Sequence, residues 1–268
     1  MNKRANIIKQ LFFAATLVTA ILLTACDRKE PKQEQAAGKE LILYCGAGIR
    51  PPVAELMEIF SREHGVKIFT DYAGSEVLLS KIKLSHRGDL YIPGDKHYIE
   101  QALQEDMVLS RRPVFYWVPT ILVQKGNPKN ISGLEDLLRP GLKLGLGDPN
   151  ACAIGRISRQ ILAKNNIAWE EIKKHVSYLS LTVNELGMQI QAKSLDAVIV
   201  WDAMARYYIE HGDEVPIAPE KNLVSTVDIG VLKFTRNREL AEKFVDFITS
   251  ERGQGVFEKH NYSTKPPE

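Results

Sequence analysis

The sequence predicts an α/β protein with two lobes, and three features of its 268 residues support this prediction. Short apolar runs of strand length alternate with segments whose apolar residues recur at helical spacing. Two long apolar stretches without helical spacing, 113–126 and 225–234, are long enough to pass from one sheet into another. The repeated order of strand, helix and strand favours mainly parallel sheets joined by right-handed crossovers.

The first lobe is predicted to begin with three pairs of a strand and a helix. Pro51 and Pro52 suit a first helical turn, and Val53, Leu56 and Phe60 follow them at helical spacing. The strands are expected at 41–45, 66–72 and 89–93, with helices after Pro52, after Ser75 and at about 97–105.

The second lobe repeats this pattern, and the chain then returns to the first. Strands are expected at 143–148, 178–181 and 196–201, with helices after Gly155 and at 184–192. Two helices that begin near Asn237 and Ser250 complete the chain. We therefore expect residues 40–118 and 228–268 to form lobe 1, residues 119–227 to form lobe 2, and two hinge crossings to join them.

The N-terminus has the features of a lipoprotein signal peptide, predicted at residues 1–25. Basic residues precede an apolar run at 11–23 that is shorter than the ~20 residues needed to span a bilayer. The end of the segment, Leu23–Cys26, resembles the bacterial lipobox, which would make Cys26 the lipidated first residue of the mature protein. Residues 26–39 are polar and charged, which is typical of a flexible tether. We expect an exported protein, periplasmic or at the cell surface, held on the membrane by a lipid anchor.

Charge and cysteine content exclude several kinds of site. Removal of residues 1–25 takes away three basic groups and no acidic group, so the formal net charge falls from +2 to −1 and no field favours nucleic acid. An exported compartment permits a disulfide between Cys45 and Cys152, although two separate, small buried residues are the simpler interpretation. The six histidines show no ligand spacing with one another or with these cysteines, so no metal-cation site and no cofactor are predicted.

Four strand-to-helix junctions consist of small or neutral residues. Ligands of open parallel sheets bind at the carboxyl ends of the strands, and helix N-termini there present unpaired N–H groups and a partial positive charge. Together the junctions predict an anion-binding site, although each one alone could be a tight turn. The junctions lie at 45–48, 73–75, 151–155 and 182–184.

The combination of these junctions with other segments resembles a known family. The segments are YCGAGIR (44–50), DYAGS (71–75), GDL (88–90), GNP (126–128), residues 141–149, GR (155–156) and IVW (199–201). They are similar to the periplasmic molybdate- and tungstate-binding proteins of ABC importers, which belong to the extracellular solute-binding proteins. The resemblance covers the chain from about residue 40. It implies a periplasmic-binding-protein clamshell that closes on a tetrahedral oxyanion and delivers it to a membrane permease. We expect a monomer.

The resemblance also implies a set of ligand-binding residues. Ser75 matches a serine that gives a hydroxyl and an amide to the anion, and Ile154 and Val183 match backbone amide donors. Gly48 stands where better-known members have a second serine. Trp201 stands where they have a tyrosine, and its indole N–H could replace the phenol as a donor; the alternative is a core residue that ends a buried strand. These departures preserve an anion site, but they weaken the prediction that the anion is molybdate in particular.

The charged residues leave alternatives open. Molybdate, tungstate and sulfate offer only acceptor oxygens, whereas hydrogen phosphate needs an acceptor for its proton. Asp148 and Asp202 could supply that acceptor, although an Asx turn or a helix cap is the simpler interpretation of Asp148, and a helix N-cap that of Asp202. Arg50 and Arg156 could reach the anion or remain solvated on their helices. The alternatives are a receptor for sulfate, phosphate or an organic anion and, more remotely, an exported hydrolase. No Gly-X-Ser-X-Gly or Cys/His arrangement is present, so we expect no enzyme.

Overall fold

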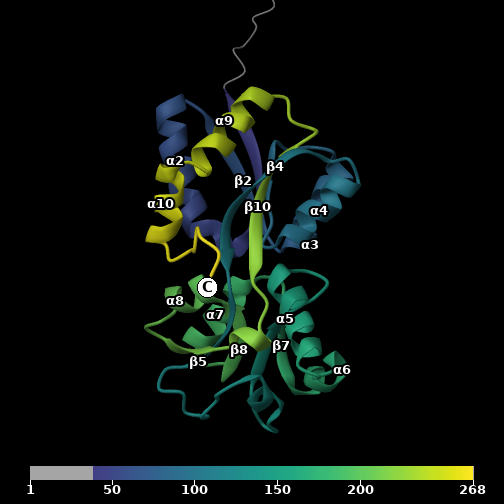
Figure 1. Cartoon of the computed structure of the whole chain (residues 1–268), viewed down its shortest axis with the longest axis vertical. Helices are drawn as coiled ribbons and strands as arrows, with labels where there is room; N and C mark the ends of the chain where they lie inside the picture. Colours follow the sequence, from purple (N-terminus) through teal and green to yellow (C-terminus); the bar gives the residue numbers. More distant parts are fainter. Residues whose placement is uncertain (1–38, 268) are drawn as a thin grey trace, which may run out of the picture. The chain divides into compact units, whose positions relative to one another are not determined.

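A computed structural model describes residues 39–267 and arranges them around two five-stranded sheets (Figure 1). The predicted signal peptide, Cys26 and the tether up to residue 38 lie outside the described residues. The first lobe contains the sheet with strand order β2-β1-β3-β10-β4, and the second lobe contains the sheet with order β7-β6-β8-β5-β9. The bounds are β1 Glu40–Gly46, β2 Lys67–Ala73, β3 Leu90–Ile92, β4 Val108–Trp117, β5 Pro119–Gln124, β6 Leu144–Gly147, β7 Val176–Ser180, β8 Ala197–Trp201, β9 Gly212–Pro216 and β10 Ser225–Leu232.

Each sheet is mainly parallel and contains one reversed strand. In the first lobe, β1 pairs in parallel with β2 and β3, and β10 runs antiparallel between β3 and β4. In the second lobe, β6 pairs in parallel with β7 and β8, and β5 runs antiparallel between β8 and β9. The reversed strands are the two that the chain enters after a crossing. The predicted α/β class with two mainly parallel sheets is therefore confirmed.

Helices flank both sheets and begin where the strands end. In α2, Pro51 and Pro52 occupy the first turn, and Gly65 ends the helix with a left-handed backbone. The helices are α2 Arg50–His64, α3 Ser75–Ser85, α4 Lys96–Gln104, α5 Ala153–Lys164, α6 Trp169–Ile172, α7 Val183–Gln191, α8 Asp202–Tyr207, α9 Arg238–Ile248 and α10 Glu251–Lys259. Four short 3-10 helices are η1 Ala47–Ile49, η2 Leu134–Leu138, η3 Lys173–His175 and η4 Pro219–Lys221.

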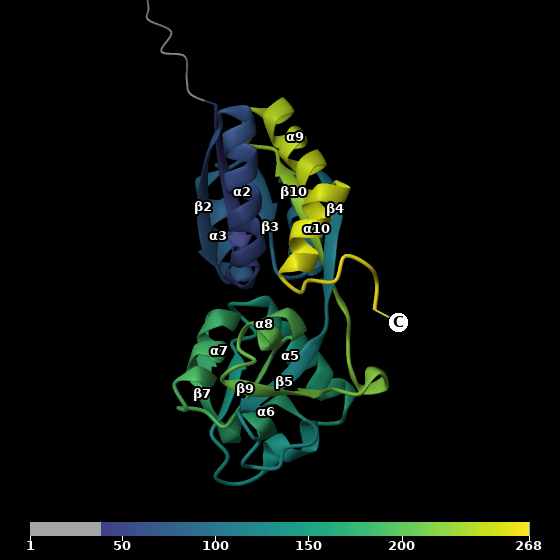
Figure 2. The same ribbon diagram turned by 90° about the vertical axis from the view of Figure 1, so that its left-hand side faces the viewer.

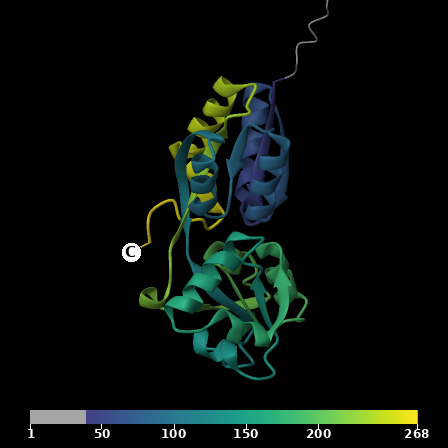
Figure 3. The ribbon, with the colours of Figure 1, turned by 90° about the vertical axis from the view of Figure 1, so that its right-hand side faces the viewer.

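Two stretches of chain connect the lobes. Val118 alone separates the end of β4 from the start of β5, so the apolar run 113–126 passes from one sheet into the other, as the sequence predicts. The return passes into β10, whose first residue, Ser225, pairs with Trp117 (Figure 2). The same connections are seen from the opposite side in Figure 3. The exact lobe limits predicted at 118/119 and 227/228 stay a prediction.

Some elements differ from the sequence expectation. The helix expected after Gly155 begins at Ala153 instead, because Gly155 lies inside its first turn against the preceding loop. A Cβ atom at Gly155 would lie 2.4 Å from the carbonyl of Asp148, so this glycine permits a close backbone approach. Strand β9 and helices α6 and α8 are additions to the prediction. Within residues 39–267, no helix is long and apolar enough to cross a membrane.

Candidate functional site

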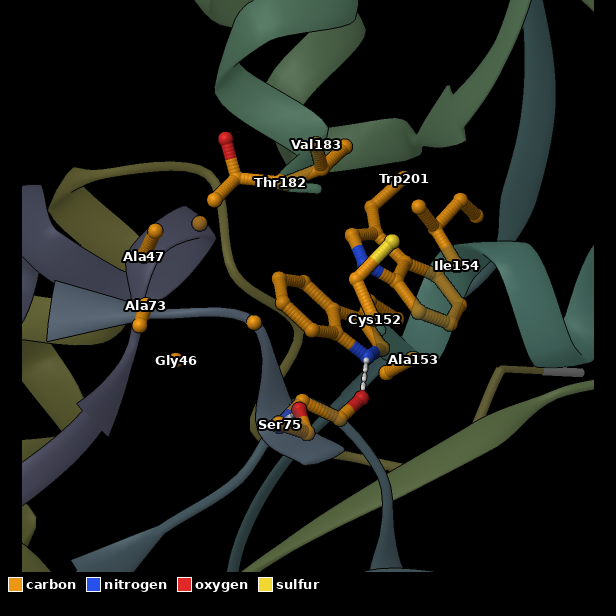
Figure 4. Close-up of a pocket in the computed structure, with 14 residues that line it drawn as sticks. Gly46, Ala47, Ala73, Ser75, Cys152, Ala153, Ile154, Thr182, Val183 and Trp201 are labelled. Carbon is orange, nitrogen blue, oxygen red and sulfur yellow. Dashed lines mark hydrogen bonds between the residues drawn. The ribbon is translucent and has the colours of Figure 1, made fainter. Parts of the chain in front are cut away.

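The four predicted junctions meet at one pocket between the lobes (Figure 4). Its first-lobe wall comes from the ends of β1, β2, β3 and β4, and its second-lobe wall from the starts of α5 and α7 and the end of β8. The lining residues are Gly46, Ala47, Gly48, Ala73, Gly74, Ser75, Gly94, Trp117, Cys152, Ala153, Ile154, Thr182, Val183 and Trp201.

The pocket gathers the five residues predicted to hold the ligand, and its described lining contains no charged side chain. Gly48 and Ser75 belong to the first lobe, whereas Ile154, Val183 and Trp201 belong to the second. The two arginines considered as additional ligands are not among the lining residues. The pocket therefore offers neutral groups from both lobes.

The helix starts at this pocket lack side-chain caps. The residues that precede η1, α3, α5 and α7 are Gly46, Gly74, Cys152 and Thr182, and none of them makes a side-chain cap hydrogen bond. Asp95 and Ser250, which are not lining residues, cap α4 and α10, whereas α6 and α9 also begin without a side-chain cap. First-turn N–H groups have no partner within their own helix. These helix starts can therefore donate to a bound anion.

The hydrogen bonds around Ser75 make its hydroxyl a donor. Ser75 is only 2% exposed, and its Oγ accepts a hydrogen bond of 2.9 Å from the backbone N–H of Gly94. The hydroxyl of Tyr91 donates to the backbone carbonyl of Ser75 at 2.8 Å, and the indole N–H of Trp117 donates to the carbonyl of Gly94 at 3.1 Å. Because Oγ already accepts one bond, the serine O–H proton is available to a ligand in the pocket.

Two tryptophans from different lobes stack beside the pocket. The ring centroids of Trp117, at the end of β4, and Trp201, at the end of β8, lie 4.4 Å apart, and their planes differ by 5°. Both side chains are buried. Trp201 thus satisfies both interpretations of the sequence, since it ends a buried strand and also lines the pocket.

The two candidate arginines have other partners. The Arg156 guanidinium forms an ion pair with Asp95 of the first lobe. Arg50 is exposed, and its guanidinium lies 5.0 Å from the ring centroid of Tyr72, which is a cation–π geometry.

The two candidate carboxylates also lie outside the lining. Asp148 Oδ1 accepts a bond of 2.8 Å from the N–H of Asn150, which is the expected turn. Asp202 is the first residue of α8 rather than its N-cap, which is Trp201, so the cap expected from sequence is wrong by one position. Its Oδ1 accepts a bond of 3.1 Å from the N–H of Val118, and burial raises the pKa of this carboxyl.

Comparison with known proteins places the chain in a family. A family model described as bacterial extracellular solute-binding protein matches residues 41–263. The chain belongs to this family. The solute-binding protein is 25% identical to a binding protein of Haemophilus influenzae, over 90% of this chain and 94% of the relative. It is 23% identical to the molybdate-binding protein ModA of Mycobacterium tuberculosis, over 92% of this chain and 96% of the relative.

A solved structure supports the same fold. The sulfate-binding protein SubI from Mycobacterium tuberculosis superposes with a TM-score of 0.74 at 19% identity, covering 85% of this chain and 88% of SubI. At this identity the likeness establishes the two-lobed fold and leaves the solute to be argued from the pocket itself.

The pocket of the solute-binding protein is small. Its cavity volume is about 20 Å³, measured as the space open to the centre of a water-sized sphere. On this measure one water molecule needs at least roughly 10–15 Å³. The pocket in this conformation is therefore close to the size needed for a single water molecule, and it is too small for a sugar or a peptide.

The two described cysteines remain separate thiols. Cys45 is buried in β1, and Cys152 lies in the pocket lining, and neither forms a disulfide. Burial raises the pKa of the Cys152 thiol to about 12, so the thiol is protonated at neutral pH. Its sulfur lies 3.7 Å from the carbonyl oxygen of Asp148 and 3.8 Å from that of Ser180, and its single S–H can donate to either one.

Two lining residues, Gly94 and Trp117, lie outside both the predicted ligand set and the four predicted junctions, although the sequence held a signal for each of them. Gly94 lies near the end of a strand, as Gly46 and Gly74 do. Trp117 lies in the stretch predicted to cross between the lobes, where a large side chain must lie near both. Cys152 belongs to the predicted junction at 151–155, but the helix predicted after Gly155 begins three residues earlier, at Ala153, so Cys152 is its N-cap residue.

Proposed function

We propose that this solute-binding protein captures a tetrahedral oxyanion, molybdate or tungstate in the first place, and delivers it to an ABC permease. The observation that carries the proposal is a pocket lined without charged side chains, at which uncapped helix starts from two lobes meet. In this role Ser75 gives a hydroxyl and an amide, and Gly48, Ile154 and Val183 give amides. Trp201 gives its indole N–H.

The energetics explain why both lobes are needed. Transfer of an ion out of water costs several kcal/mol even after the protein relaxes around it. Each hydrogen bond to a charged group contributes about 1.5–3 kcal/mol. One helix start cannot offset the dehydration of a dianion, whereas the combined donors of η1, α3, α5 and α7 can.

The hydrogen-bonding character of the pocket favours anions whose oxygens only accept. Hydrogen phosphate needs an acceptor for its proton, yet the carboxylates of Asp148 and Asp202 are outside the lining and bound to backbone N–H groups. Molybdate, tungstate and sulfate need no such acceptor. Relatedness to a protein named as molybdate-binding supports the first two.

Sulfate is the second candidate. It has the same acceptor-only chemistry, and the fold neighbour SubI is named as sulfate-binding. The replacement of the expected serine and tyrosine by Gly48 and Trp201 also removes two hydroxyl donors of the molybdate pattern. The small cavity argues against a larger organic anion. A protonated Cys152 thiol without a neighbouring base among the lining residues offers no activated nucleophile for a hydrolase.

The predicted lipidation of Cys26 completes the proposal. A lipid chain on Cys26 would hold the protein at the membrane that contains the permease, and residues 26–39 would give it reach. The protein would act as a monomer.

Calorimetric titration of the protein without its signal peptide tests the function. Molybdate, tungstate, sulfate and hydrogen phosphate are added in turn, and we expect tight binding of molybdate and tungstate. Sulfate as the tightest ligand would select the second candidate. Binding of hydrogen phosphate alone, or of none of the four, would overturn the proposal.

A further inference from the structure

An ion pair beside the pocket, between a buried aspartate and a partly buried arginine, joins the two lobes. The carboxylate of Asp95 in the first lobe contacts the guanidinium of Arg156 in the second, and their side chains are 5% and 20% exposed. Among the described ion pairs, most others are far more exposed, such as that of Arg112 with Asp246 at 46% and 61%. Exposed pairs contribute little to stability, whereas a buried pair is costly to break.

The first lobe holds both oxygens of the Asp95 carboxylate. Oδ1 accepts a bond of 2.9 Å from the N–H of His97, which caps α4, and Oδ2 accepts a bond of 2.5 Å from the hydroxyl of Ser225. Ser225 begins β10, directly after the return crossing. The carboxylate is therefore fixed in place before it meets Arg156.

Both partners lie within two residues of a pocket residue in the sequence. Asp95 follows Gly94, whose N–H bonds to the hydroxyl of Ser75. Arg156 lies in the first turn of α5, directly after Gly155 and two residues after Ile154. The ion pair thus connects the peptide that orients Ser75 with the helix start that presents Ile154.

The lobes are in close contact at this edge of the pocket. The N–H of Glu76, in α3, donates to the carbonyl of Ala151 in the second lobe at 3.2 Å. A Cβ atom at Gly94 would lie 3.0 Å from the Cβ of Ala153. The ion pair therefore belongs to the arrangement in which the two halves of the anion site are together.

We propose that Asp95 and Arg156 form a clasp, defined as this ion pair, that positions the two halves of the anion site without touching the anion. The inference rests on the proposed function only for the choice of molybdate as a probe. Loss of either partner leaves the other charge buried and unpaired in the closed form. The closed population then falls, and the apparent affinity falls by the same factor.

The competing explanation is that Arg156 itself binds the anion. Its Nε is buried without a hydrogen-bond partner among residues 39–267, so an anion could in principle meet it there. The two explanations predict opposite changes in anion affinity for one variant. Asp95→Asn would release Arg156 toward the pocket and strengthen binding if Arg156 were a ligand, whereas it weakens binding if the pair is a clasp.

The test uses Asp95→Asn, Arg156→Met and the double variant. Asn caps helices about as well as Asp, so the start of α4 is retained. Each single variant should weaken molybdate binding in calorimetry by at least about tenfold, through the loss of closed protein. The double variant should lose less than the two single losses combined, because no unpaired charge remains buried. Asp246→Asn breaks the exposed pair with Arg112 inside the first lobe and should leave the affinity unchanged.

A second measurement needs no anion. With Trp169→Phe as background, Trp117 and Trp201 are the remaining tryptophans, and they stack across the lobes in this structure. We expect separation of the lobes to disturb this stack. The near-ultraviolet circular dichroism of this stack should diminish in the anion-free single variants and persist in Asp246→Asn. If molybdate does not bind the parent protein, the proposed function fails while this measurement still tests the clasp. An unchanged stack signal in both single variants, or tighter molybdate binding by Asp95→Asn, would overturn the proposal.

Discussion

Ser75 is the residue whose surroundings define its role most sharply. Its hydroxyl oxygen accepts from the Gly94 N–H, and its carbonyl accepts from the Tyr91 hydroxyl. The serine O–H proton has no partner among these bonds and can donate into the pocket. This arrangement suits an anion whose oxygens accept hydrogen bonds.

We expect Ser75→Ala to weaken molybdate binding by about 1–3 kcal/mol, because one hydrogen bond to a charged group is lost. Calorimetry gives the dissociation constant, and the melting temperature without anion shows whether the fold is intact. An unchanged dissociation constant would remove Ser75 from the site.

Trp117 lines the pocket, but its indole N–H is already used by the Gly94 carbonyl. In Trp117→Phe an aromatic ring remains to pack against Trp201, but the indole bond to the Gly94 carbonyl is lost. We expect a weaker effect on molybdate affinity than in Ser75→Ala, about 0.5–1.5 kcal/mol, since one neutral hydrogen bond is lost. Titration of both variants under the same conditions checks the order, and a larger loss in Trp117→Phe would contradict it.

At the scale of elements, the sequence predicted the helix starts well because their chemistry is local. Gly46 ends β1, and Gly74 and Thr182 come directly after β2 and shortly after β7, so the end of the strand and the small residues define the junction together. Because the carboxyl ends of parallel strands lie at the same edge of a sheet, the junctions lie close together.

Other elements depend on contacts that a linear pattern does not contain. Strand β9, Gly212–Pro216, pairs with β5 although it has little apolar alternation. Helix α8 has six residues, too few for a helical period to emerge. The pair of Asp95 with Arg156 joins residues far apart in the sequence, so neither residue alone indicated it.

The start of α3 gives a prediction about lobe approach. A Cβ atom at Gly74 would lie 2.4 Å from the carbonyl oxygen of Ala151 and 2.6 Å from that of Leu181, both in the second lobe. Gly74→Ala should therefore fold, yet fail to close fully. We expect molybdate binding to weaken more than about tenfold by the loss of closed protein. Calorimetry measures this. Gly255→Ala, in α10 where a Cβ meets no atom within 4 Å, is the control and should bind as the parent does.

At the scale of the whole molecule, the first crossing is fixed to the second lobe by Asp202. The N–H of Asp202 donates to the carbonyl of Val118 at 2.8 Å, and its carboxylate accepts from the N–H of Val118 at 3.1 Å. Val118 is the single residue between β4 and β5. Movement of one lobe against the other therefore takes place next to this buried carboxylate.

The raised pKa of Asp202 predicts a pH dependence of stability. Its folded pKa lies above the unfolded value near 3.8, so its stabilising contribution is present below that value and is lost as pH rises through the folded pKa. Asp202→Asn keeps an oxygen for the Val118 N–H and removes this loss. The free energy of unfolding of the variant minus that of the parent should therefore be larger at pH 7 than at pH 4. Urea unfolding at both pH values measures the difference, and an equal difference at both would contradict the prediction.

The described lining of the pocket contains no charged side chain, and this affects how anion binding depends on the salt concentration. Salt weakens attraction between exposed charges over distances of about 8 Å at 0.15 M ionic strength. The N–H and O–H donors of the pocket would contact a dehydrated anion directly, so no salt ion could enter between them and screen the interaction. An extracellular receptor built in this way should retain its cargo about equally well in fresh water and in brine.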